Sequence, residues 1–140
     1  MSFLLDTNVI SEFAKPAPDN GVQKWLREHQ DQNLYLSVLT IGELQQGIVR
    51  LPQSKKRTNL MAWLNDTVLV EYADFILPID VDTMLHWGTL TGNLKQQDRN
   101  LSVMDGLIAA TALKHHLELV TRNESDFADT GPVIINPWKD

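Results

Sequence analysis

The sequence predicts a three-layer α/β/α domain, with helices on both faces of a mainly parallel sheet of about five strands. Five short apolar runs of strand length recur along the chain, and stretches with helical periodicity separate them. Strands that alternate with helices form parallel sheets, because each connection carries a helix over one face. The chain has 140 residues, no internal repeat and no Gly/Ser-rich linker. We therefore expect a single domain over residues 1–140.

The expected elements alternate regularly from the first apolar run to the last. Strands are expected at residues 3–5, 34–38, 75–79, 117–121 and 133–135. Helices are expected at residues 8–14, 21–29, 39–50, 54–72, 82–97 and 102–116, the fourth either continuous or broken near Asp66.

The third expected helix carries an apolar stripe. Ile41, Leu44, Ile48 and Leu51 recur at helical spacing, so we expect them to face the core. Glu43 then lies beside the stripe, with no basic residue three or four positions away to form an ion pair within the helix.

The sixth expected helix is apolar nearly all round, which is typical of a buried central helix. Ser102 and Asp105 resemble a capping box at its start. A carboxylate is therefore expected in the first turn of a buried helix.

Composition excludes several classes of protein. The chain has no cysteine, which excludes disulfide scaffolds, thiolate metal sites and cysteine nucleophiles. No basic leader precedes Asp6 and no apolar run approaches the ~20 residues of a membrane span, so a cytoplasmic protein without membrane contact is expected. The formal net charge is -6, which argues against binding nucleic acid through overall positive charge.

Four acidic residues fall where ligands bind in open α/β sheets. Asp6, Glu43 and Asp126 follow strands, and Asp105 joins them if its helix begins at the same sheet edge. Carboxylates gathered at one place repel each other unless a cation lies between them. Oxygen ligands favour Mg²⁺ or Mn²⁺, and Mg²⁺ binds substrate phosphates as well. The sequence therefore indicates phosphodiester chemistry.

Each of these residues also has an ordinary structural explanation when taken alone. Asp6 suits the cap of the helix that follows it, and Asp105 suits the positive end of its own helix. Glu43 suits a solvated helix surface, and Asp126 suits a turn.

Taken together, four segments resemble the PIN-domain nucleases, and among them the VapC/FitB-like toxins of toxin-antitoxin pairs. The segments cover essentially the whole chain in the order of that family. They are Leu-Leu-Asp-Thr-Asn-Val-Ile-Ser-Glu at 4–12, Ser-Val at 37–38 with Gly-Glu-Leu at 42–44, Asp-Gly-Leu-Ile-Ala-Ala-Thr-Ala at 105–112, and Leu-Val-Thr-Arg-Asn at 119–123 with Asp-Phe at 126–127.

The resemblance implies a PIN-like fold and a Mg²⁺- or Mn²⁺-dependent endoribonuclease, with tRNA as one candidate substrate. It implies a cognate antitoxin as partner, a homodimer, and contact with DNA only through the antitoxin. Its four acidic positions correspond to Asp6, Glu43, Asp105 and Asp126 as catalytic metal ligands. The number of metal ions stays open.

The resemblance also implies supporting residues around the acidic positions. Thr121 and Asn123 correspond to polar supports, and Asn8 is expected to orient Asp6. Arg122 is a candidate for contact with RNA phosphate, or alternatively for an ion pair with Glu124 or with a site carboxylate.

Other basic and apolar residues suggest partner surfaces. The run Lys-Lys-Arg at 55–57 is either a solvated helix start or a contact to the RNA backbone. Apolar side chains on the second and fourth expected helices are candidates for contact with an antitoxin: Trp25, Leu26, Leu60 and Leu64.

An alternative function is a catalytically weak PIN-like module that acts by protein binding or as co-repressor with a DNA-binding partner. A phosphatase of the haloacid dehalogenase type is disfavoured, because Asn8 stands where such sites have a second aspartate.

Overall fold

The computed structural model describes residues 1–139 and contains the expected alternation of strands and helices. The strands are β1 (Ser2–Leu5), β2 (Asn33–Ser37), β3 (Ile76–Leu77), β4 (Glu118–Val120) and β5 (Ile134–Ile135). The helices are α1 (Thr7–Glu12), α2 (Asn20–Glu28), α3 (Val38–Val49), α4 (Lys55–Ala62), the π-helix η1 (Trp63–Val68), α5 (Leu69–Glu71), α6 (Val81–Gln96), α7 (Val103–His115) and the 3₁₀-helix η2 (Glu124–Phe127).

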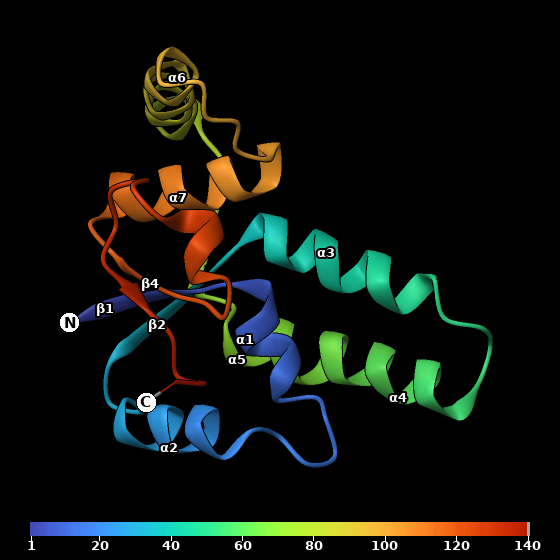
Figure 1. Ribbon diagram of the computed structural model, residues 1–140. Helices are drawn as coiled ribbons and strands as arrows, with labels where there is room; N and C mark the ends of the chain where they lie inside the picture. Colours follow the sequence, from blue (N-terminus) through green and yellow to red (C-terminus); the bar gives the residue numbers. More distant parts are fainter. Residues whose placement is uncertain (140) are drawn as a thin grey trace.

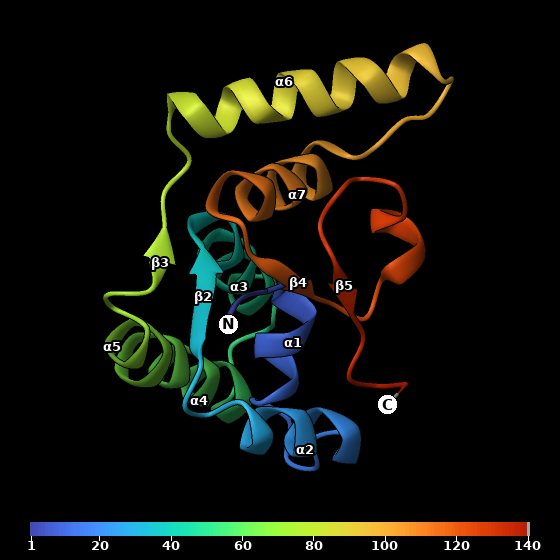
Figure 2. The ribbon, with the colours of Figure 1, turned by 90° about the vertical axis from the view of Figure 1, so that its left-hand side faces the viewer.

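The sheet has five parallel strands in the order β3-β2-β1-β4-β5, with β1 in the middle (Figure 2). Leu4 lies opposite Tyr35 of β2 and Leu119 of β4 in the register. The predicted parallel sheet of about five strands is confirmed. Because all strands run the same way, their carboxyl ends lie at one edge, where Asp6 and Thr121 directly follow β1 and β4 and where Ser37 ends β2.

Two apolar clusters lie on opposite faces of the sheet, as the period of two in a strand requires. Phe3 and Leu5 of β1 pack into the cluster built with α1, α2, α3 and η1, whereas Leu4 packs into the cluster built with α7. Figure 1 shows α6 and α7 on one side of the sheet and α1, α2, α4 and α5 on the other. The three-layer α/β/α prediction is confirmed.

The segment at 54–72 is helical, as predicted. Of the two alternatives near Asp66, the continuous one holds, because the chain runs from α4 through the π-helix η1 into α5. Leu64 and Val68 of η1 are both buried in the first cluster. The wider π turn therefore keeps these apolar side chains in the core without ending the helical segment.

Helix α7 is buried nearly all round, as predicted, and α6 lies across its outer side (Figures 1 and 2). The two helices approach closely at Gly106, where an added Cβ would lie 2.9 Å from Nε1 of Trp87. None of the helices in residues 1–139 combines the length and the apolar character that crossing a membrane requires.

Candidate active site

Asp6 is the most firmly held of the four predicted acidic residues. It caps α1 directly after β1 and is only 7% exposed. Its Oδ1 accepts a hydrogen bond from the backbone N–H of Thr7 at 2.8 Å. Its Oδ2 accepts from Oγ1 of Thr121 at 2.8 Å and from Nδ2 of Asn8 at 3.4 Å. Asp6 is thus both a helix cap and a buried, fixed carboxylate.

Burial raises the pKa of Asp6, and the negative charges of Asp105 and Glu43 raise it further. The hydrogen bonds from Thr121 and Thr7 oppose this rise by stabilising the charged form. These charge effects on the pKa of Asp6 mean that Glu43 and Asp105 each lie close enough to Asp6 to interact with it. A positive charge at this place would relieve the desolvation and the repulsion together.

Glu43 is held by a residue that the sequence did not single out. Thr7, the first residue of α1, donates from Oγ1 to Oε1 of Glu43 at 2.6 Å. A 3.0 Å hydrogen bond also joins the hydroxyls of Thr7 and Thr40. Thr7 therefore links β1 and α1 to α3. Its place between Asp6 and Asn8 in the first matched segment was the available signal.

Asp105 lies in the first turn of α7, where its backbone N–H donates to Oγ of Ser102 at 3.1 Å. Ser102 is therefore the N-cap of α7, as expected. Burial raises the pKa of Asp105, the Ser102 hydrogen bond lowers it, and the charge of Asp126 raises it. Asp126, on η2, is exposed, and both carboxylates line a pocket of about 290 Å³.

The predicted supporting residues lie around Asp6. Thr121 is fully buried, and its Oγ1 accepts hydrogen bonds from the backbone N–H of Asn123 at 3.1 Å and from Nδ2 of Asn8 at 3.3 Å. Oδ1 of Asn8 accepts from the backbone N–H of Arg122 at 3.2 Å. The loop after β4 is therefore tied through Thr121 and Asn8 to the Asp6 carboxylate.

Of the alternatives for Arg122, the ion pair with Glu124 is not formed. Lys139 takes that place, with Nζ at 2.6 Å from Oε2 of Glu124. The guanidinium of Arg122 lies instead 5.4 Å from the ring centre of Trp138, a cation–π arrangement. Within residues 1–139 Arg122 forms no ion pair, so its charge stays available beside the site.

The four acidic residues share the absence of a basic partner. The ion pairs among residues 1–139 involve other carboxylates in every case. In the same part of the chain no three His, Asp or Glu side chains converge closely enough to form a ready metal cage. The structure thus brings Asp6 near Glu43 and Asp105, and Asp105 near Asp126, without joining all four at one point.

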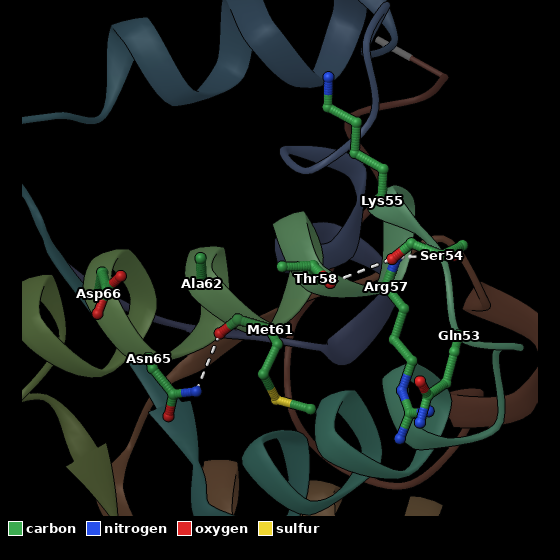
Figure 3. Close-up of a pocket in the computed structure, with 9 residues that line it drawn as sticks. All are labelled: Gln53, Ser54, Lys55, Arg57, Thr58, Met61, Ala62, Asn65 and Asp66. Atoms are coloured by element: carbon green, nitrogen blue, oxygen red, sulfur yellow. Dashed lines mark hydrogen bonds between the residues drawn. The ribbon is translucent and has the colours of Figure 1, made fainter.

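The run at 55–57 opens α4. The pockets that its residues line contain none of the four predicted acidic residues. Lys55 and Arg57 line a shallow pocket of about 770 Å³ along α4, where the Arg57 side chain runs beside Gln53 and Lys55 extends the other way (Figure 3).

The predicted apolar partner surface is wrong for two of its four residues. Trp25 and Leu64 are 7% and 2% exposed, because both pack in the first cluster under the sheet. Leu60 instead lines a separate apolar pocket of about 270 Å³ between α1, α3 and α4. Its other apolar lining residues are Ala14, Pro16, Leu44, Ile48 and Trp63.

Known proteins resemble the chain over nearly all of its length. The VapC ribonuclease Y4jK of Sinorhizobium fredii is 39% identical over 136 residues, 97% of each chain. Toxin FitB of Neisseria gonorrhoeae is 36% identical over 137 residues, 98% of this chain and 99% of FitB.

Solved structures agree with these relatives. The FitAcB structure from N. gonorrhoeae matches with a TM-score of 0.89 and 36% identity over 99% of both chains. The structure of FitAB bound to the IR36 DNA fragment also gives a TM-score of 0.89, with 34% identity over 99% of this chain and 96% of that one. The family model of the PIN domain matches residues 3–131. The chain therefore belongs to the PIN domain family, with VapC and FitB toxins among its relatives.

Proposed function

We propose that this protein is a Mg²⁺- or Mn²⁺-dependent endoribonuclease and the toxin of a toxin-antitoxin pair, acting in the cytoplasm. Relatives named VapC ribonuclease and Toxin FitB, which align over nearly the whole chain, support the activity and the biological role. The observation that carries the proposal is the Asp6 carboxylate, which is buried, hydrogen-bonded and close to two further carboxylates without a basic partner among residues 1–139.

The donor set suits a hard divalent cation. All four acidic side chains offer oxygen, and burial, together with neighbouring negative charge, raises the pKa of Asp6 and of Asp105. Mg²⁺ usually takes one or two carboxylates and completes its shell with water and phosphate oxygens. Asp6 together with Glu43 or Asp105 would therefore be sufficient to hold the cation. Asp126 would bind the cation directly or through a water molecule.

When bound, the cation would polarise the scissile phosphate and lower the pKa of a water molecule for attack. The protein side chains prepare that place. Thr121 and the Thr7 N–H hold the Asp6 carboxylate in one orientation, and the Thr7 hydroxyl holds Glu43. Arg122, with its backbone fixed by Asn8, offers a guanidinium to an RNA phosphate at the same sheet edge. A protein of net charge -6 needs such local positive charge.

An RNA cleavage assay with the purified full chain tests the proposal. We expect cleavage with Mg²⁺ or Mn²⁺, none with chelator, and a loss of at least about a thousandfold in Asp6→Asn and Asp105→Asn, because each amide removes ligand charge while keeping the shape. Asp74→Asn is the matched control, since Asp74 is an exposed loop residue.

Cleavage that survives chelation, or that persists in both site variants, would reject this function. An inactive wild-type chain that still forms a complex with a DNA-binding partner would favour the alternative, a PIN-like module that acts as co-repressor.

The proposed partners are an antitoxin, a second copy of this chain and an RNA substrate, with tRNA as a candidate. We place an apolar antitoxin segment in the pocket between α1, α3 and α4, and a basic antitoxin side chain over the acidic site in place of the cation. DNA would be contacted only through the antitoxin, and one structural neighbour of this chain is FitAB bound to the IR36 DNA fragment. Val81, Leu85 and Val103 expose apolar surface on α6 and α7 that suits the second copy.

A further inference from the structure

A second charged feature lies beside the proposed metal ligands. The pocket of about 290 Å³ is enclosed by the end of α6, the start of α7 and η2. Its polar lining residues are Arg99, Asn100, Ser102, Asp105, Ser125 and Asp126. The pocket therefore holds a guanidinium together with two of the four proposed catalytic carboxylates, and Arg99 is its single basic lining residue within residues 1–139.

The backbone of Arg99 is placed by the way α6 ends. Asp98 adopts the left-handed conformation with φ 57°. The N–H of Asp98 donates to the carbonyl of Lys95 at 3.0 Å, and the N–H of Arg99 donates to the carbonyl of Leu94 at 2.9 Å. This pair of hydrogen bonds is the Schellman motif, which closes a helix end with defined geometry. Arg99 consequently leaves α6 in a fixed direction.

The side chain of Arg99 is also fixed. Nη1 donates to Oδ2 of Asp129 at 2.9 Å, and Nη2 donates to the carbonyl of Ala128 at 3.0 Å. A guanidinium has five N–H groups, so three remain for another acceptor. Arg99 is 37% exposed, and Asp129 does not line the pocket. The ion pair thus orients the guanidinium and leaves donors available to a ligand in the pocket.

A ligand that suits this pocket must satisfy both signs of charge. RNA does so, because one phosphate shares a divalent cation with the carboxylates while the next phosphate along the backbone accepts hydrogen bonds from a guanidinium. An acidic protein segment suits it less well, since it brings no cation to offset Asp105 and Asp126. We infer that Arg99 binds the RNA phosphate adjacent to the scissile one, in a subsite formed by this pocket; this inference rests on the proposed ribonuclease function.

Steady-state RNA cleavage by the full chain with Mg²⁺ tests the subsite. We expect Arg99→Gln to raise KM about tenfold, while kcat stays within about threefold, because a contact outside the reacting phosphate contributes mainly to binding. The slope of log(kcat/KM) against log[salt] should flatten by about 0.7, the value for one lost phosphate contact on a single strand. Arg99→Lys should recover part of the loss, since it keeps the charge and loses the planar fork.

Two further variants separate RNA binding from a purely structural role. Asp129→Asn removes the partner of Arg99 but leaves its charge in the pocket, so we expect KM to change less than about threefold even if Tm falls as far as in Arg99→Gln. Arg50→Gln, at an exposed position after α3, is the matched control and should leave KM and the salt slope unchanged.

Equal increases of KM in Arg99→Gln and Asp129→Asn would show that Arg99 only stabilises the segment at 128–129, and would overturn the inference. An unchanged KM in Arg99→Gln with weaker antitoxin binding would assign the pocket to the protein partner instead. A wild-type chain without metal-dependent cleavage would refute the proposed function and this subsite together, whereas an active wild type with an unaffected Arg99→Gln refutes the subsite alone.

Discussion

The two halves of the acidic site are built differently. Asp6 and Glu43 are held by side-chain and backbone donors from Thr7 and Thr121. Asp126 is exposed, and Asp105 has its backbone fixed by Ser102 while its carboxylate borders an open pocket. One half is therefore fixed before any ligand binds, and the other is free to adjust to one. Such a division suits a site that must position a cation and also accept a large polyanion.

The difference follows from the elements that carry the residues. Asp6 and Thr121 follow neighbouring strands, and the Asp6 N–H itself donates to the carbonyl of Val120 at 2.9 Å. Asp105 and Asp126 come from the first turn of a helix and from a short 3₁₀-helix, which lie outside the hydrogen-bond ladder of the sheet. The sheet thus supplies rigidity to one half only.

The largest effect is expected where the fixed half loses its main donor. Thr121→Val preserves the shape but removes the hydroxyl that donates to Asp6, so we expect cleavage at limiting Mg²⁺ to fall about 10- to 100-fold, with partial recovery at high Mg²⁺. The Mg²⁺ dependence of initial rates measures this. Thr111→Val is the matched control, because the buried Thr111 hydroxyl bonds a backbone carbonyl within α7. An equal loss in Thr111→Val would mean that both variants act through stability.

In the second half of the site, formed by Asp105 and Asp126, the position of α7 depends on how closely α6 packs against it. Gly106→Ala places a Cβ against the Trp87 ring, and we expect it to lower the free energy of unfolding by about 1 to 2 kcal/mol, since overpacking outweighs the gain in helix propensity. Gly92→Ala on α6 meets no atom within 4 Å and should stabilise the protein by up to about 1 kcal/mol. Denaturant unfolding measures both. A stabilised Gly106→Ala would show that α6 is not held at this contact.

The smallest effect compares Asp6→Asn with Asp126→Asn in metal-free protein. Burial raises the pKa of Asp6 above the ordinary value for an aspartate, so the ionised native carboxylate destabilises the fold at neutral pH. Asp6→Asn should therefore raise Tm at pH 7 by a few degrees, and the difference should shrink as pH falls through the raised pKa. Asp126→Asn, at an exposed position, should leave Tm nearly unchanged. A lower Tm for Asp6→Asn at pH 7 would contradict the direction of the shift.

Much of the fold could be predicted because its signals are local. Apolar runs and helical periods place each element within a few residues, and strand-helix alternation predicts the parallel sheet. The helical stretch over 54–72 could be predicted, but the π geometry of Trp63–Val68 could not, because it depends on burying Leu64 and Val68 under the sheet. The same burial removes Leu64 and Trp25 from the expected partner surface. Amphipathic periodicity shows which side chains are buried only when the opposing layer is known.

The candidate site shows the same limit. The four acidic residues could be identified from the matched segments, and Thr7 is the neighbour of Asp6 in the sequence. The sequence does not show that Thr7 reaches Glu43 on α3, because the angle between α1 and α3 is set by tertiary packing. It also does not show that Lys139 binds Glu124 and leaves Arg122 over Trp138, since these contacts join distant parts of the chain.

The position of β1 in the middle of the sheet has a consequence for synthesis. The first strand to leave the ribosome must wait for β4 before it is paired on both sides. The hydrogen bond from Thr121 to Asp6 spans 115 positions, so the fixed half of the site cannot assemble until Thr121 has emerged from the ribosome. Fragments released early during translation would lack this half. Cleavage activity is consequently expected only from chains that have been synthesised past Thr121.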